Sequence, residues 1–213
     1  MEISFKKYLL SAAIGFGIGG AIWGGILYSW IPVEYPIDIT GAFICIFGGI
    51  GLSIFSKDIK KILKVSGLGV LGYLIGFVFA FLGIYHLPIW WMRVFSLFIP
   101  AQLPENIINF IDFLGLNPAL PIGTYWLNFS LVGIFIGLFF AISLKTKIWP
   151  VIWRGGIGFG LGSLIGPVLG NLIGNLFGLL VINYLLTFSL IGAIFGIFLA
   201  WGIYKSQKAN IKN

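Results

Sequence analysis

Charged side chains are scarce in this sequence. Only 9% of its 213 residues are charged and 59% are hydrophobic, whereas a soluble domain carries roughly 25% charged residues. A chain of this size has too little polar surface to cover so many apolar side chains in water. The composition therefore predicts an all-α, polytopic integral membrane protein, with the lipid bilayer as its first partner.

Cysteine and histidine are almost absent, with one of each. A single cysteine excludes an internal disulfide and a multi-cysteine metal site, and His86 alone offers no paired metal ligands and no triad base. The deep apolar segments also lack Asp, Glu, Lys and Arg, which usually mark proton relays, ion-coupling sites or catalysis in a membrane. We therefore expect no enzymatic activity, no catalytic residue, no cofactor and no metal.

The few cations are concentrated at certain points of the chain. All of the 13 Lys and Arg residues except Arg93 fall in four clusters, which are separated by pairs of apolar segments. This is the positive-inside pattern, and it predicts a cell (cytoplasmic) membrane protein with both termini in the cytoplasm. The net charge of +7 therefore argues for membrane topology and not for a nucleic-acid partner. The clusters are Lys6/Lys7, Lys57 to Lys64, Lys145 to Arg154 and Lys205 to Lys212.

The apolar segments between the clusters predict six transmembrane helices of ~20 residues each. We place them at about 8–30, 39–56, 66–87, 125–145, 154–174 and 184–204. The one long connection is an outer insert at 88–124. It contains an aromatic stretch and a segment that opens on Pro104, so it predicts short helices at the membrane interface.

Glycine is abundant, with 31 residues. A glycine at every fourth position of an apolar helix lets a neighbouring backbone approach closely. Such a stripe runs through 154–174, and weaker copies lie in the first and third segments. The predicted helix-packing residues are Gly15, Gly19, Gly72, Gly76, Gly158, Gly162, Gly166, Gly170 and Gly174. We expect the glycine-rich odd segments to make the inner contacts and the bulkier even segments to face lipid.

These glycines suggest an internal repeat. Gly15, Gly72 and Gly162 each lie eight residues after the basic residue that opens their segment, which is Lys7, Lys64 or Arg154. A single transmembrane domain, 1–213, would then consist of three like-oriented hairpins with pseudo-threefold arrangement. The hairpins cover 7–57, 64–145 and 154–205, and 206–213 would be a short cytoplasmic tail. A register shifted by one helical turn in the first hairpin pairs IGFGIGG with IGFGLGS and remains open.

Uncharged polar residues gather near the predicted outer level. They predict a polar cup for a solute, or else helix caps and interhelical hydrogen bonds of ~0.6 kcal/mol each. Pro167 removes a backbone donor and would make either a hinge or an ordinary bend. The candidate cup consists of Asn128, Ser130, Asn171, Asn175, Asn183, Thr187 and Ser189.

Two functions fit these patterns. One is a small-solute transporter, channel or solute-binding membrane subunit with an outward-facing cup and a glycine-lined central path. The other is a non-catalytic accessory or scaffold subunit, whose glycine-rich faces pack against other membrane subunits or against copies of itself. No motif in the sequence identifies a substrate.

Overall fold

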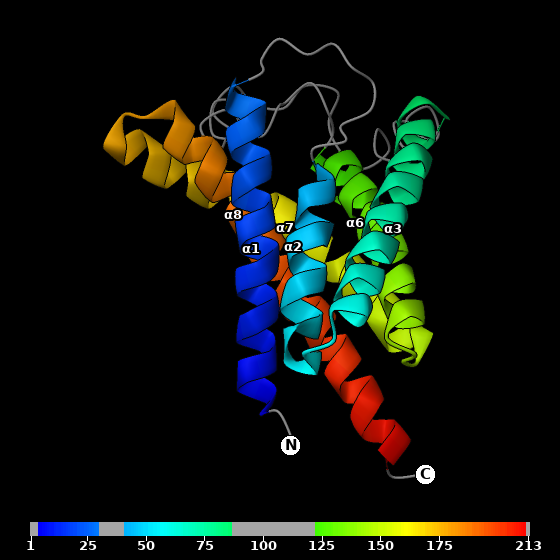
Figure 1. Ribbon diagram of the computed structural model, residues 1–213. Helices are drawn as coiled ribbons and strands as arrows, with labels where there is room; N and C mark the ends of the chain where they lie inside the picture. The colour runs from blue at the N-terminus through cyan, green and yellow to red at the C-terminus, as the bar shows by residue number, and fades with distance from the viewer. Residues whose placement is uncertain (1–3, 30–40, 87–121, 212–213) are drawn as a thin grey trace.

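The computed structural model describes residues 4–29, 41–86 and 122–211, and every regular element in these ranges is a helix. Figure 1 shows them as a bundle of long rods. The predicted all-α class is confirmed. The predicted helices of the 88–124 insert fall almost wholly outside the described residues. The elements are α1 (Phe5–Ser29), α2 (Ala42–Ser53), the 3-10 turn η2 (Ile54–Ser56), α3 (Ile59–His86), α6 (Ile122–Ser143), α7 (Ile148–Phe177) and α8 (Leu180–Ile211).

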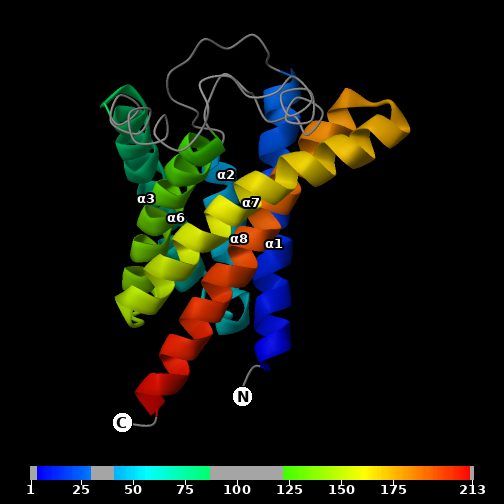
Figure 2. The same cartoon turned by 180° about the vertical axis from the view of Figure 1, so that it is seen from behind.

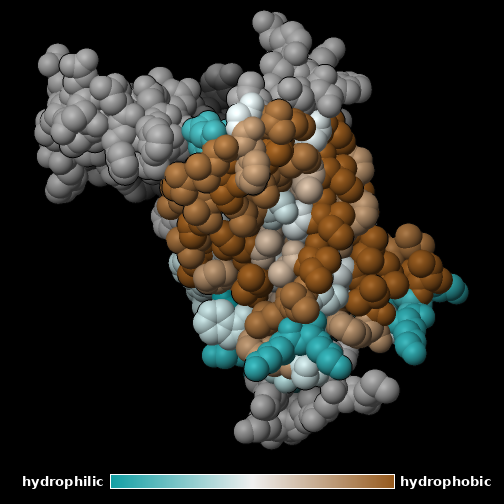
Figure 3. Space-filling model, turned by 90° about the vertical axis from the view of Figure 1, so that its left-hand side faces the viewer, coloured by the Kyte–Doolittle hydropathy of each residue, from teal (hydrophilic) through white to brown (hydrophobic). Residues whose placement is uncertain are grey.

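Within the described residues, four helices are long and apolar enough to cross a membrane, at Phe5–Ile26, Ile59–Ala80, Ile148–Phe177 and Val181–Gln207. Two shorter apolar stretches accompany them, at Ala42–Ser56 and Asn128–Ser143. On the face shown in Figure 3, a broad apolar band lies above an end where most of the hydrophilic side chains collect. The protein is therefore suited to be embedded in a membrane.

Several helices extend beyond the predicted apolar segments. Helix α3 begins at Ile59 and not near residue 66, because Asp58 Oδ1 accepts the Lys60 N–H at 3.0 Å and the lysines that follow are good helix formers. Helix α8 continues to Ile211, through most of the predicted tail. The apolar pattern therefore located the helices but underestimated how far α3 and α8 extend.

Helices α7 and α8 are joined by Gly178 and Leu179 alone. Gly178 has φ +64°, its N–H bonds to Asn175 O at 3.3 Å, and the Leu179 N–H bonds to Gly174 O at 3.3 Å. The left-handed conformation of Gly178 and these two backbone hydrogen bonds form the C-terminal cap of α7. In Figures 1 and 2 the α7–α8 link lies to one side of the other helices, and α7 crosses them obliquely. We refer to residues 170–187 as the α7–α8 arm.

The six α-helices of the described residues follow one another around a closed ring. Each packs on its neighbours in the chain, and α8 packs on α1. Both chain ends lie at the lower end in Figure 1. The links between helices meet at this end too: Ser206 Oγ donates to Lys147 O at 3.1 Å, and the Phe5 and Tyr204 rings are 4.8 Å apart. Lys145 and Lys205 thus belong to the same end of the bundle.

The core takes large side chains from odd and even helices alike. Phe16 of α1 and Phe159 of α7 are fully buried, and so are Ile44 of α2, Ile136 of α6 and Phe195 of α8. The expectation that odd helices form the inside while even helices face lipid is therefore wrong. In a ring, each helix turns one face inward, and the glycines mark close helix contacts without contributing buried side chains.

Candidate functional site

The polar residues predicted to form one cup are divided among four places. Asn171, Asn183 and Thr187 come together between α7 and α8. Asn183 Nδ2 donates to Asn171 Oδ1, and Thr187 Oγ1 donates to Asn183 Oδ1 at 3.1 Å. The missing Cβ of Gly170 leaves room for the Thr187 hydroxyl. This Asn–Asn–Thr cluster satisfies much of its own hydrogen bonding, as an interhelical contact does.

The other cup residues lie apart from this cluster. Asn175 is exposed near the end of α7. Ser189 lies where α8 meets α1, with its Oγ 3.6 Å from where a Cβ on Gly17 would be. Asn128 and Ser130 belong to α6, and the Ser130 hydroxyl is buried without a hydrogen-bond partner in the described structure. The described side chains therefore do not converge on a single polar cup.

Aromatic side chains fill the middle of the circle of helices. Phe16 makes edge-on contacts with Phe140 of α6 at 5.7 Å and with Phe195 of α8 at 5.0 Å, and Phe159 of α7 lies 4.8 Å from Phe195. All four side chains are fully buried. We call Phe16, Phe140, Phe159 and Phe195 the aromatic core cluster.

Two glycines make room for this cluster. A Cβ on Gly48 of α2 would strike the Phe16 ring, and a Cβ on Gly69 of α3 would lie 2.5 Å from Phe140 Cζ. Each of the six helices thus contributes either an aromatic side chain of the cluster or a glycine that leaves space for one. Sequence reasoning missed the cluster, although Phe16 and Phe159 stand at matching places in IGFGIGG and IGFGLGS.

A second aromatic group lies beside the first. Trp23 of α1 is 4.3 Å from Phe188 of α8 and 6.5 Å from Tyr73 of α3, measured between ring centroids. Trp23 and Tyr73 are 4% and 2% exposed. In the described part of the chain, the centre of the helix ring is therefore filled by aromatic side chains.

The predicted packing glycines do lie at helix contacts. Gly158, Gly162, Gly166, Gly170 and Gly174 all face α8. A Cβ on Gly162 would lie 2.8 Å from Ile191 O, and one on Gly166 would lie 2.7 Å from Thr187 O. Real Cβ atoms do not come so close to a carbonyl oxygen, so larger residues here would force the two backbones apart.

Pro167 lies inside α7, which continues without interruption on both sides of it. The carbonyl of Ser163 loses its usual partner because proline has no N–H. The Ser163 hydroxyl donates to Gly160 O at 2.7 Å, one turn back. Whether the helix bends at Pro167 during function stays a prediction.

Within the described ranges, no group of three or more His, Cys, Asp or Glu residues is placed to hold a metal ion. Cys45, the single cysteine, is fully buried in α2. Comparison of the chain with known protein families, curated proteins and solved structures finds no match.

Proposed function

We propose that this chain is a non-catalytic, multi-pass membrane protein that forms a gated passage for small, uncharged or weakly polar solutes. The observation that carries the proposal is the closed ring of six helices with only side chains at its centre. A ring closed by side chains opens when those side chains or their helices move.

The proposal takes the six helices as three like-oriented hairpins, and the glycine contacts support this. Within each hairpin, the paired glycines of the odd helix face the even helix. A Cβ on Gly15 would lie 2.5 Å from Phe47 O, and one on Gly72 would lie 2.9 Å from Phe135 O. Gly162 meets Ile191 O in the same way at 2.8 Å. Three separate seams thus repeat one mode of packing.

The contacts between hairpins repeat as well. The equivalent glycine of each even helix faces the next odd helix around the ring. Gly49 of α2 meets α3 at Ser66, Gly137 of α6 meets α7, and Gly196 of α8 meets α1. A pseudo-threefold axis through the aromatic core cluster accounts for both sets of contacts, and gene duplication of one hairpin would explain their origin.

The aromatic core cluster is the proposed gate. Hydrophobic constrictions close a pore by excluding water, without any need for charged residues. Two fully buried members, Phe16 and Phe195, lie 5.0 Å apart on the adjacent helices α1 and α8. The seam between these helices is rich in glycine, because Gly20, Gly24, Gly192 and Gly196 all lie against backbone of the opposite helix. Few side chains would have to rearrange for this seam to shift.

The proposed orientation in the membrane follows from the cationic end of the bundle. At this end, the Trp201 ring lies 4.7 Å from Arg154 Cζ and 5.1 Å from Lys205 Nζ. Trp, Lys and Arg prefer the membrane interface, and basic residues favour the cytoplasmic side. Both termini would then be cytoplasmic, and the α7–α8 arm would be at the outer face of a cell membrane.

The test is solute passage through the reconstituted protein. Liposomes containing the chain are exposed to urea or glycerol, and swelling is followed by light scattering. Phe16→Ala with Phe195→Ala should speed swelling several-fold over the wild type. Phe79→Ala is the matched control, because Phe79 stacks on Phe135 at 4.9 Å and is 54% exposed. Passage no faster than in empty liposomes for both wild type and double variant would eliminate the proposal.

A second candidate is an accessory or scaffold subunit, and the α7–α8 arm favours it. Leu176 and Phe177 at its tip are 77% and 66% exposed, and Leu172 and Leu179 are about half exposed. The chain's own helices leave these side chains uncovered in the described structure, so lipid or another membrane subunit would cover them. The test is to solubilise the membrane gently and to measure the mass of the complex that contains this chain. A stoichiometric partner lost on Leu176→Asn would favour this role.

A further inference from the structure

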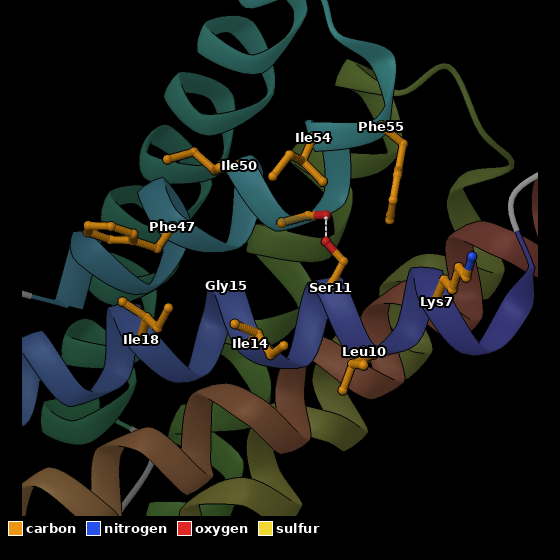
Figure 4. Close-up of a pocket in the computed structure, with 11 residues that line it drawn as sticks. Lys7, Leu10, Ser11, Ile14, Gly15, Ile18, Phe47, Ile50, Ile54 and Phe55 are labelled. Carbon is orange, nitrogen blue, oxygen red and sulfur yellow. Dashed lines mark hydrogen bonds between the residues drawn. The ribbon is translucent and has the colours of Figure 1, made fainter.

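A groove of about 500 Å³ lies between α1 and α2. Figure 4 shows Lys7 at one end of it and the apolar side chains of both helices along its length. Its floor is made by close approach of the two backbones. Ser11 Oγ donates to Gly51 O at 2.7 Å, and neither Gly15 nor Gly51 has a side chain to fill the space above.

The walls of the groove are aliphatic and aromatic. Helix α1 supplies Leu10, Ile14 and Ile18, one on each successive turn, and these are 61%, 53% and 46% exposed. Helix α2 and η2 supply the other wall, with Phe47, Ile50, Ile54 and Phe55. The Ser11 hydroxyl is already committed to Gly51. The body of the groove therefore suits a hydrocarbon chain and has no free polar group for a polar solute.

The groove has the length of one lipid leaflet. Lys7 and Ile18 are eleven residues apart on α1, which is about 16 Å at ~1.5 Å per residue. Half of a ~30 Å hydrocarbon core is about 15 Å. An acyl chain that follows the groove from its open end would thus reach the middle of the membrane, while its headgroup stays level with Lys7.

The charge at the open end selects the headgroup. The Lys7 side chain is exposed, and Lys6 adjoins it in sequence. In the described ranges the one carboxylate is that of Asp58, and its Oδ1 already accepts the Lys60 N–H. An ammonium group at the water end of an apolar groove is complementary to a lipid phosphate.

The other two intra-hairpin seams also contain aromatic side chains. Phe79 stacks on Phe135 across α3 and α6 at 4.9 Å. Along α7 and α8, Phe198 lies against Gly158, and its ring is 6.1 Å from that of Trp201. In the first hairpin, the groove has a serine and two glycines at its floor and a lysine at its end.

We propose that the α1–α2 groove binds one anionic phospholipid, with an acyl chain between the two walls and the phosphate on Lys7. The site is distinct from the proposed passage, since it opens on the outer surface of the ring and contains no member of the aromatic core cluster. It does not depend on whether the protein passes solutes.

The test measures lipid retained by the purified protein. The protein is exchanged into detergent containing equal amounts of phosphatidylglycerol and phosphatidylcholine, and bound lipid is counted by native mass spectrometry. One phosphatidylglycerol should be retained. Lys7→Gln should lower its preference over phosphatidylcholine about fivefold, the factor that one lysine near an anionic lipid surface supplies. Lys7→Arg keeps the positive charge and should keep the wild-type preference. It therefore distinguishes a loss of charge in Lys7→Gln from misfolding.

Two further variants separate the groove from general electrostatics. Ile14→Trp fills the groove at an exposed position and should remove the bound lipid while Lys7 stays in place. Lys147→Gln removes an exposed lysine from the link before α7, outside the groove, and should leave retention unchanged. Equal losses with Lys147→Gln and Lys7→Gln, or full retention in Ile14→Trp, would overturn the proposal. So would wild-type protein that holds both lipids equally.

Discussion

The ring of Phe16 on α1 meets the ring of Phe140 on α6 edge-on, at a centroid distance of 5.7 Å and an interplanar angle of 77°. These two helices are not neighbours around the ring of helices. Their contact therefore bridges the bundle from one side to the other. Edge-to-face pairs add about 0.5–1.5 kcal/mol beyond the area that they bury, so this contact helps to hold the centre of the protein closed.

Phe140→Ala should destabilise the protein by about 3–5 kcal/mol, because it leaves a cavity that the surrounding helices fill only in part. The measurement is unfolding in mixed micelles with increasing sodium dodecyl sulfate. Phe79→Ala should cost far less, since Phe79 is 54% exposed. Equal costs for the two variants would show that the aromatic core cluster is loosely packed.

Gly72→Ala should destabilise the protein, whereas Gly67→Ala should be neutral or stabilising. A Cβ at position 72 would lie 2.9 Å from Phe135 O, whereas one at 67 has nothing within 4 Å. Both residues lie within α3, so the gain in helix propensity of about 1 kcal/mol is common to both. Thermal unfolding in detergent compares them, and a neutral Gly72→Ala would contradict the close α3–α6 contact.

Asn171→Leu combined with Thr187→Leu should lower stability, because it leaves Asn183 between two apolar groups. A fully buried amide without partners costs about 1–3 kcal/mol, and the half-buried Asn183 should cost less. Asn175→Leu, at an exposed position of the same helix, is the control and should cost little. Solute passage is measured on the same proteins. Lost passage with unchanged stability would instead assign solute binding to the Asn–Asn–Thr cluster.

Topology is tested by labelling with a maleimide that does not cross membranes. Lys61→Cys and Lys147→Cys should both react from the cytoplasmic side alone, because both positions are exposed and belong to the proposed cytoplasmic end. The native Cys45 is fully buried and should stay silent in intact protein. Labelling of the two new cysteines from opposite sides would refute the hairpin arrangement.

The sequence allowed part of this structure to be predicted. Glycine spacing is a local signal, and Gly72 and Gly162 do lie buried against another helix, as the spacing indicates. The aromatic core cluster was out of reach, since rings from four helices converge only after the helices are placed. The positions of the predicted cup residues around the helix ring were out of reach for the same reason. Asn171 and Ser189 are close in predicted depth, but they lie at different seams of the ring.

The length of α7 has a consequence for the surrounding bilayer. Its 30 residues measure about 45 Å, half as long again as a ~30 Å hydrocarbon core. Inclination is one way in which so long a helix matches the membrane, and the angle changes with lipid chain length. Because α8 follows α7 along the whole glycine stripe, a thicker bilayer would draw both helices upright and alter how they meet the other four. Short-chain and long-chain lipids should therefore act on this protein as opposing effectors.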